Sequence, residues 1–227
     1  MISKKVIVAL DSNNINLTIK LVKKLKSEVY AFKIGYQFFL NFGLNGYKKI
    51  YSICPKIFLD LKLHDIPNTI NKSVDALSKI KPLLTTIHIS GGDEMMKSAL
   101  KMKRGIKILG VSILTSLDSR QTLKYYNQKK ILYLVKKFAR AAKKNGLDGV
   151  ICSPKEIKYI RKEVGKKFII ITPGIRIKKK INKDDQKRIE TPRKAIEMGA
   201  NYLVIGRPIT ESKNPLKTLK EINKTLL

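Results

Sequence analysis

The sequence predicts an α/β protein with the fold of a single (β/α)8 TIM barrel, and three observations predict it. Eight short apolar runs recur along the 227 residues, and segments with helical periodicity separate them. Strict alternation of apolar strands and helices is typical of a parallel sheet covered by helices. Eight such units in a chain of this length favour a closed barrel over an open sheet. No linker or low-complexity segment divides the chain, so we expect one domain over residues 1–227.

The predicted strands are short apolar runs rich in β-branched residues. In chain order they cover residues 6–10, 31–35, 57–62, 85–90, 106–114, 149–152, 168–172 and 202–206. Apolar residues at helical spacing fill the intervals, as at Leu17, Leu21 and Leu25 and in the stretch 131–142. Two connections, residues 115–130 and 173–190, are longer than the others. Ordered loops of this length often carry function.

The composition indicates a globular protein of the cytoplasm. Hydrophobic residues make up 43% of the chain, which is enough for a core. No apolar run reaches the roughly 18 residues of a membrane span, and the run at residues 6–10 is too short for a signal-peptide core. We therefore expect no membrane partner. Cys54 and Cys152 lie far apart, which predicts neither a disulfide framework nor a zinc site and favours a reducing compartment.

The net charge of +31 raises the question of a nucleic-acid partner. Only eight of the 48 basic residues are arginine, whereas contacts with base edges and bidentate contacts with phosphate favour arginine. The lysines are spread over the whole chain, mostly on helical segments whose charged face we expect in solvent. We expect no specific nucleic acid partner, although weak, salt-sensitive binding of polyanions is compatible with this charge.

Polar and charged residues follow the predicted strands one after another. In a (β/α)8 barrel the active site forms where the strands end, at the C-terminal face. In chain order these ends present Asp11, Lys33 with Gly35, Asp60 with Lys62 and Asp65, His88, Thr115 with Ser116, Arg176, and Gly206 with Arg207. The sequence thus predicts a single mouth lined by charges of both signs.

The segment FLDLKLHDIPNT at residues 58–69 is the most informative. Alternate residues of a strand point to opposite faces, so Asp60 and Lys62 share one face, and the other is formed by Leu59, Leu61 and Leu63. Opposite charges in an apolar strand are costly unless they are paired or used. Asp65 falls just past the strand, where the chain turns through a proline into a helix. The pattern predicts a preassembled array of charges, or else an ion-pair network with only a structural role.

Asp11, Lys33, Asp60, Lys62 and Asp65 together indicate a chemistry. Two unit charges about 4 Å apart interact by roughly 4 kcal/mol at an effective dielectric constant of about 20. Such an array holds a lysine ammonium near a reacting carbon, and a substrate carboxylate beside Asp60 is repelled until it leaves as CO2. Lys62 then protonates the carbanion as a general acid.

The ends of the last two strands fit a phosphate site. Loops after strands seven and eight of this architecture commonly bind phosphate. Gly206 lets backbone N–H groups approach the oxygens, and Arg207 offers a bidentate contact, although Gly-Arg-Pro by itself also fits a tight turn. The connection 173–190 contains Arg176, several lysines and Gln186, which suits an anionic ligand.

Other residue types indicate less. We expect His64 to be a hydrogen-bonded supporting residue, and His88 either lines the site or is a satisfied core histidine. With two histidines and no carboxylates clustered with them, the sequence does not indicate a metal site. It contains no Gly-x-Gly-x-x-Gly after a strand, the signal of a dinucleotide site, and no recognised serine–histidine arrangement.

Along essentially its whole length the chain resembles the orotidine 5′-phosphate decarboxylase family of bacterial type. The resemblance rests on an ordered set of short pieces at the strand ends. They are ALD at 9–11, KIG at 33–35, FLDLKLHDIPNT at 58–69, HISGG at 88–92, LTS at 114–116, TPGIR at 172–176, DQKR at 185–188 with TP at 191–192, and VIGRP at 204–208. Ile89 stands where the family usually has a small residue, which concerns packing near the fourth strand.

The resemblance implies decarboxylation of orotidine 5′-monophosphate to uridine 5′-monophosphate (UMP) in the last step of UMP synthesis, without a metal or organic cofactor. Lys62 would protonate C6 of the pyrimidine, Asp60 would sit beside the departing carboxylate, and Lys33 would order the array. The other implied substrate contacts are Asp11 and Lys33 at the ribose, Thr115 or Ser116 at the base, Gln186 between base and phosphate, and Arg176, Gly206 and Arg207 at the phosphate.

The resemblance also implies a homodimer. In that arrangement Asp65, Ile66 and Thr69 of one subunit would reach into the site of the other, so each site would lie at the interface.

The sequence leaves two alternative functions open. Sugar-phosphate lyases on the same barrel share the Asp-x-Lys-x-x-Asp pattern but place a metal-binding glutamate on the second strand. Here Lys33 stands at that position, and a cation there would repel Mg²⁺. A basic barrel that binds nucleic acid would keep the lysines while the array of charges eroded, and here the array is intact.

Overall fold

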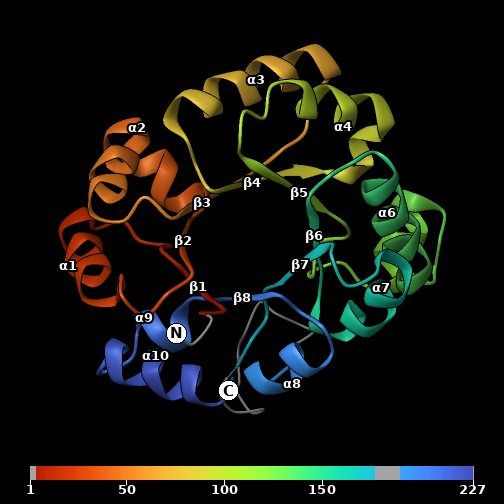
Figure 1. Ribbon diagram of the computed structural model, residues 1–227. Helices are drawn as coiled ribbons and strands as arrows, with labels where there is room; N and C mark the ends of the chain where they lie inside the picture. Colours follow the sequence, from red (N-terminus) through yellow and green to blue (C-terminus); the bar gives the residue numbers. More distant parts are fainter. Residues whose placement is uncertain (1–3, 177–189, 227) are drawn as a thin grey trace.

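The computed structural model describes residues 4–176 and 190–226, and it confirms the predicted barrel. Parallel strands close into a ring in chain order, with the last strand paired to the first. They form the inner ring of Figure 1, and helices surround them. The strands are β1 (Val6–Ala9), β2 (Ala31–Ile34), β3 (Ile57–Leu63), β4 (Leu84–His88), β5 (Lys107–Val111), β6 (Gly149–Ile151), β7 (Ile169–Thr172) and β8 (Tyr202–Ile205).

The helices cover the outside of the ring. They are α1 (Ile15–Leu25), α2 (Tyr36–Ile53), α3 (Pro67–Ile80), α4 (Gly92–Lys101), α5 (Ser119–Tyr126), α6 (Ile131–Lys144), α7 (Ile157–Val164), α8 (Pro192–Glu197), α9 (Arg207–Thr210) and α10 (Pro215–Lys224), with 3-10 turns η1 (Ile89–Gly91) and η2 (Pro154–Glu156). Among the described residues, no helix is long and apolar enough to cross a membrane.

Local signals start several of these helices soon after a strand ends. The Asn14 side chain accepts a hydrogen bond from the Leu17 N–H at 3.1 Å and caps α1. Pro67 occupies the first turn of α3, where its missing N–H costs nothing. Because α1 begins soon after β1 and α3 begins soon after β3, the two connections are short turns at the mouth of the barrel.

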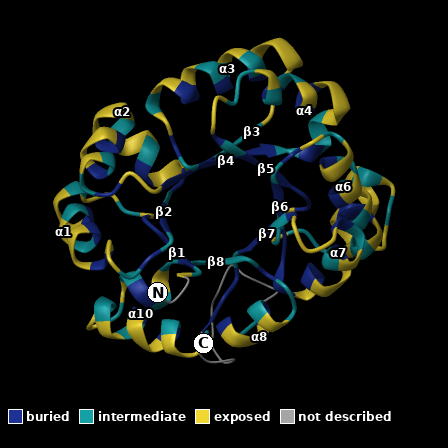
Figure 2. Cartoon of the chain, viewed as in Figure 1, coloured by how far each residue is buried: buried dark blue, intermediate teal, exposed yellow. Residues whose placement is uncertain are grey.

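The inside of the barrel is filled in layers. The layer farther from the mouth is an apolar cluster made of Ile7, Ala31, Phe58, Leu84, Leu109 and Ile171. A larger core lies between the strands and the helices, and Figure 2 shows the strands buried while the outer helix faces are exposed. Side chains two residues further along a strand point the same way. Lys33, Asp60 and Thr86 therefore stand directly above Ala31, Phe58 and Leu84, as a polar layer resting on an apolar one.

The predicted strands are right in number and order but wrong at several ends. Residues 89–90, predicted as strand, belong to η1, because the chain turns there toward Gly92 with its φ of +89°. Residues 112–114 lie beyond β5, and a turn follows in which the Leu117 N–H bonds the Leu114 carbonyl at 3.0 Å. The connection 115–130 is not a loop throughout, since Asp118 and Gln121 form a capping box that begins α5.

Other expectations concern single residues. Of the leucines at helical spacing in α1, Leu17 is 61% exposed, whereas Leu25 is fully buried. Cys54 and Cys152 are both buried free thiols, so no disulfide joins them. Residues 177–189 of the second long connection lie outside the described residues.

Ile89, where the resembled family has a small residue, fits because of a glycine on β5. The Ile89 side chain is 2% exposed. A Cβ placed on Gly110 would lie 2.5 Å from Ile89 Cγ1 and 2.7 Å from Ile89 Cδ1, closer than carbon atoms approach in proteins. The two residues therefore compete for one volume between the sheet and the helices.

We expect Gly110→Ala to destabilise the protein by about 1–3 kcal/mol, the usual cost of overpacking a core. In an Ile89→Ala background the same substitution should cost less, because the smaller residue leaves room for the new methyl group. Urea unfolding of the wild type, the two single variants and the double variant measures both costs. Equal costs in the two backgrounds would contradict the competition for space.

Candidate active site

Four of the predicted residues meet at the mouth in a row of alternating charge, here called the charge row: Asp11, Lys33, Asp60 and Lys62. Lys33 Nζ lies 3.1 Å from Asp11 Oδ1 and 3.9 Å from Asp60 Oδ2. Lys62 Nζ lies 2.9 Å from the same Asp60 oxygen. The parallel pairing of β1, β2 and β3 places these residues side by side. The predicted array of charges is therefore present, except for Asp65.

Asp60 is the centre of the charge row and is 7% exposed. Its Oδ2 faces both ammonium groups, and its Oδ1 accepts a hydrogen bond from the Thr86 hydroxyl at 2.8 Å. Burial acts to raise the pKa of the Asp60 carboxyl, but the charges of Lys33 and Lys62 and the hydrogen bonds from Lys62 and Thr86 outweigh it. The pKa lies below its ordinary value, so the buried carboxylate is ionised at neutral pH.

Gly35 provides space for the charge row. A Cβ at this position would lie 2.7 Å from Lys33 Nζ and 3.3 Å from Asp11 Oδ1. The φ of Gly35 is −104°, a value that any residue adopts, so the demand here is for volume and not for backbone freedom. The sequence shows only that Gly35 stands two residues after Lys33, because the role of this glycine depends on where that lysine points.

The backbone of β3 is irregular where Lys62 stands. The pairing with β4 runs from Leu59–Thr85 to Leu63–Ile87, so β3 has two more residues than β4 in this interval. Lys62 has a φ of +44°, in the left-handed region that non-glycine residues seldom occupy. The regular alternation expected along this strand is therefore broken, although Asp60 and Lys62 still meet.

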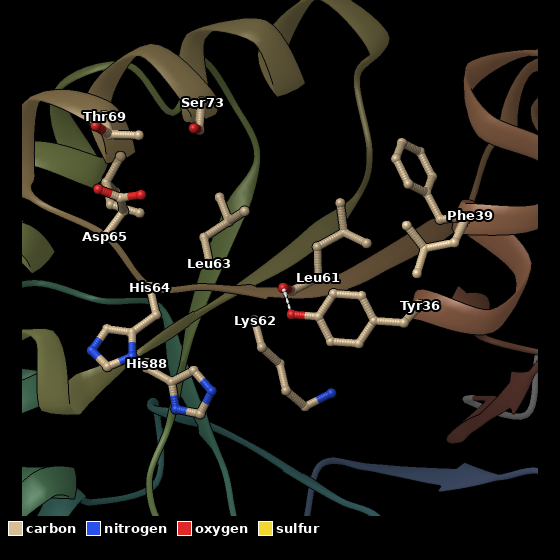
Figure 3. Close-up of a pocket in the computed structure, with 12 residues that line it drawn as sticks. Tyr36, Phe39, Leu61, Lys62, Leu63, His64, Asp65, Thr69, Ser73 and His88 are labelled. Carbon is tan, nitrogen blue, oxygen red and sulfur yellow. Dashed lines mark hydrogen bonds between the residues drawn. The ribbon is translucent and has the colours of Figure 1, made fainter.

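An open pocket of about 520 Å³ lies beside Lys62, between α2 and α3. Figure 3 shows Lys62 directed toward the barrel and the Asp65 carboxylate directed away from it, beside Thr69. Asp65 Oδ1 accepts a hydrogen bond from the Ile66 N–H at 2.7 Å. Ile66 is 67% exposed, and Thr69 is also exposed. Within one chain, then, Asp65, Ile66 and Thr69 form a separate group outside the charge row.

Two histidine rings lie close to Lys62. The centroids of His64 and His88 are 5.1 Å apart. Burial, together with the neighbouring His64 and Lys62, holds the pKa of His88 below its ordinary value against the opposing effect of Asp60. His88 is therefore neutral at pH 7 and adds no charge next to Lys62. The hydrogen bond expected for His64 is not found among the described residues, where the ring contacts His88 instead.

The residues predicted to bind phosphate lie at the ends of β7 and β8. Arg176 is 7% exposed. Its N–H bonds the Glu190 carbonyl at 3.0 Å, and the Glu190 N–H bonds the Gly174 carbonyl at 3.2 Å, so the two ends of the connection 173–190 meet. Arg207 is exposed at the start of α9. A Cβ on Gly206 would make only ordinary contact with Ala9, at 3.4 Å, so packing alone does not require glycine there.

Of the three residues predicted to bind the base, the structure describes two. Thr115 is half-buried and Ser116 is exposed, just beyond the end of β5. Gln186 lies outside the described residues. In the part of the chain that the structure describes, no group of three or more His, Cys, Asp or Glu side chains is placed to hold a metal ion.

Sequence reasoning missed Thr86. This threonine is fully buried on the inner face of β4 and bonds directly to Asp60. A weak signal existed, because Thr86 stands two residues before His88 and so shares its face of the predicted strand. A threonine in a strand is ordinarily a β-branched packing residue, however, and nothing in the sequence says which carboxylate its hydroxyl meets.

Comparison with known proteins gives a consistent result. Residues 4–222 match the model of the "Orotidine 5′-phosphate decarboxylase / HUMPS family". The chain is 43% identical over 223 residues to the orotidine 5′-phosphate decarboxylase of Wolbachia pipientis subsp. Culex pipiens, covering 97% of this chain and 98% of the relative. It is 39% identical to the enzyme of the same name from Pseudoalteromonas translucida, covering 99% and 97% of the two chains.

Solved structures agree with the fold. The crystal structure of orotidine 5′-phosphate decarboxylase from Lactobacillus acidophilus superposes with a TM-score of 0.85 at 36% identity and covers 99% of each chain. An uncharacterized conserved protein from Geobacillus kaustophilus superposes with a TM-score of 0.84 at 28% identity, covering 98% of this chain and all of that one.

The lowered pKa of Asp60 predicts a pH dependence of stability. Because the folded-state pKa lies below that of an unfolded aspartate, the ionised carboxylate stabilises the folded protein. This contribution is complete above the unfolded value of about 4 and is lost as the pH falls through the lower folded-state value. We expect the free energy of unfolding to fall more steeply in this acid range for the wild type than for Asp60→Asn. Urea unfolding at several pH values tests this, and parallel curves would contradict it.

Proposed function

Because the chain belongs to the orotidine 5′-phosphate decarboxylase / HUMPS family, we propose that its charge row carries out the decarboxylation for which the curated relatives are named. The chain is a carboxy-lyase that converts orotidine 5′-monophosphate to UMP, the last step of UMP synthesis. The observation that carries the proposed roles is the Lys62 ammonium held 2.9 Å from a buried carboxylate, Asp60.

The proposed step places these two side chains at the reacting carbon. The substrate carboxylate on C6 lies beside Asp60, and two like charges about 4 Å apart repel each other by roughly 4 kcal/mol at an intermediate dielectric constant. The bond from C6 to the carboxylate breaks, its electron pair stays on C6, and CO2 leaves. Lys62 Nζ gives a proton to C6, becomes a neutral amine and regains a proton from water.

Lys33 and Asp11 would orient the reacting pair and bind the ribose. The Lys33 side chain is 12% exposed and faces Asp60, whereas the Asp11 side chain is 50% exposed. Asp11 is thus the member of the charge row most open to ribose hydroxyls. Fixed charges of this kind need no rearrangement during the reaction, which is the usual source of electrostatic catalysis.

The phosphate and the base would be held at the other strand ends. Gly206 supports this proposal, since packing does not demand a glycine there and a close ligand would. Arg176 and Arg207 supply charge at the same end of the barrel, and Thr115 or Ser116 supplies a hydroxyl for the base. Gln186 stays a prediction as the link between base and phosphate. Binding energy from the remote phosphate then organises the site.

The second half of each site would come from a partner subunit in a homodimer. Asp65 and Thr69 line an open pocket instead of joining the charge row of their own chain, and the Ile66 side chain is exposed to solvent. Exposed apolar side chains surround that pocket, with Leu40 at 78% exposure and Tyr36 at 52%. A second copy packed on this surface would cover these side chains and bring Asp65 to the neighbouring Lys62. The cytoplasmic location likewise stays a prediction.

We expect purified protein to convert orotidine 5′-monophosphate to UMP in the presence of excess chelator, because the proposed step uses no metal. Loss of the absorbance of the substrate and chromatography of the product measure turnover. Turnover only after Mg²⁺ is added back would favour the metal-dependent chemistry of the related sugar-phosphate lyases. Absence of turnover under both conditions would contradict the assignment.

In the same assay, Lys62→Ala should abolish turnover, because the Lys62 ammonium lies 2.9 Å from Asp60, whereas the other ammonium that faces this carboxylate, that of Lys33, lies 3.9 Å away. Lys97→Ala is the matched control, since Lys97 lies on α4 and forms an ion pair with the exposed Glu94. Its activity should equal that of the wild type. An active Lys62→Ala variant would show that the proton comes from another group.

Hybrid dimers test the shared site. We expect Asp65→Asn and Lys62→Ala to be nearly inactive alone and to regain up to about a quarter of wild-type activity when mixed. Random exchange makes half the dimers hybrids, and each hybrid has one intact site. Differently tagged subunits verify that hybrids form. If verified hybrids stay inactive, Asp65 does not serve the partner's site.

A further inference from the structure

One peptide group of β3 is held from both sides by side-chain hydroxyls. The Leu61 carbonyl accepts a hydrogen bond from the Tyr36 hydroxyl at 2.6 Å, shown as the dashed line in Figure 3. The Lys62 N–H, on the other side of the same peptide bond, donates to Thr86 Oγ1 at 3.0 Å. Tyr36 comes from α2 and Thr86 from β4, so two different elements hold the peptide that leads into Lys62.

This peptide lies where the strand is least regular. Between the Leu59–Thr85 and Leu63–Ile87 pairs the two strands are out of step, and Lys62 has its φ of +44° in that interval. A lysine adopts a left-handed conformation at a cost, and such residues persist only where the surroundings hold them. The hydroxyls of Tyr36 and Thr86 supply the polar partners that the interrupted ladder does not.

Thr86 also bonds to the carboxylate beside Lys62. A hydroxyl has one hydrogen to donate and lone pairs with which to accept. Since the oxygen of Thr86 accepts from the Lys62 N–H, its own hydrogen goes to Asp60 Oδ1, at 2.8 Å. Thr86 is fully buried, so water does not compete for these bonds. A single hydroxyl therefore couples the backbone of Lys62 to the carboxylate that its ammonium faces.

We propose that Tyr36 and Thr86 form a hydroxyl clamp that positions Lys62 for proton transfer, an inference that rests on the proposed function. Both are positioning residues, because they act through the Leu61–Lys62 peptide and Asp60 and not on the substrate. Thr86 is the dominant member, since it is buried and makes two bonds. Tyr36 is half-exposed and makes one.

Removing the Thr86 hydroxyl should lower kcat and leave KM nearly unchanged. Thr86→Val keeps the shape of the side chain but leaves the Lys62 N–H and Asp60 Oδ1 without this partner. We expect a loss in kcat on the order of 100-fold, the effect of a misplacement of about 1 Å at a reacting group. KM should change little, because the proposed phosphate and base contacts lie on other strands. Thr86→Ser, which keeps the hydroxyl, should retain most of the activity.

Tyr36→Phe should cause a smaller loss in kcat than Thr86→Val. The two substitutions act on the same peptide, so their combined effect should differ from the product of the separate effects. If Thr86→Val keeps the wild-type kcat, or if Thr86→Ser loses as much as Thr86→Val, the hydroxyl clamp is wrong.

The preceding residue offers a matched control. Thr85 is equally buried, but its hydroxyl donates to the Leu59 carbonyl at 2.9 Å and has no bond to the charge row. Thr85→Val makes the same chemical change on the same strand and should leave kcat unchanged. A fall in kcat as large as that of Thr86→Val would mean that the effect comes from general loosening of β4, and would overturn the proposal.

A measurement without substrate separates the clamp from the proposed reaction. Amide hydrogen exchange of Lys62, followed by NMR, should be faster in Thr86→Val than in the wild type and unchanged in Thr85→Val. Unchanged exchange in Thr86→Val would overturn the clamp even if the wild type is active. A wild type that does not turn over orotidine 5′-monophosphate would contradict the proposed function, while the exchange experiment would still test whether the clamp holds the peptide.

Discussion

The rest of the site depends on one buried charge, the carboxylate of Asp60. A carboxylate with 7% exposure is tolerable only when cations and donors surround it. That requirement calls for Lys33 and Lys62 on either side, and Lys33 in turn needs the space that Gly35 leaves and the counter-charge of Asp11. Removing Asp60 takes away the carboxylate that Lys62 faces, and removing Lys33 takes away the ammonium that Asp11 faces, so the members of the row depend on one another.

The barrel gives this unit a rigid base. The residues two places before Lys33, Asp60 and Thr86 belong to the apolar layer below, and that layer is closely packed. The packed core therefore holds these polar side chains in fixed positions. Flexible loops could bring the same residues together, but each would then lose conformational freedom on every catalytic cycle.

The sequence predicted the barrel and the members of the charge row because both follow from local patterns. Eight apolar runs alternate with helices, and parallel strands bring their ends to one edge. The rest depends on neighbours that are distant in sequence. The left-handed backbone of Lys62 arises from the mismatch between β3 and β4, the role of Gly35 from the direction of Lys33, and that of Thr86 from its contact with Asp60. The roles at the ribose, at the base and in the partner's site came from family resemblance, not from spacing.

The tight fit of Ile89 against Gly110 has a consequence for the history of the chain. A side chain at position 110 and an isoleucine at position 89 compete for the same space. A mutational path on which the glycine precedes the isoleucine therefore avoids the cost of overpacking, whereas the reverse order passes through a destabilised protein. Once Ile89 is present, a substitution of Gly110 carries that cost even though position 110 lies outside the charge row. In steric epistasis of this kind, the stability of the intermediate protein depends on which of the two substitutions comes first.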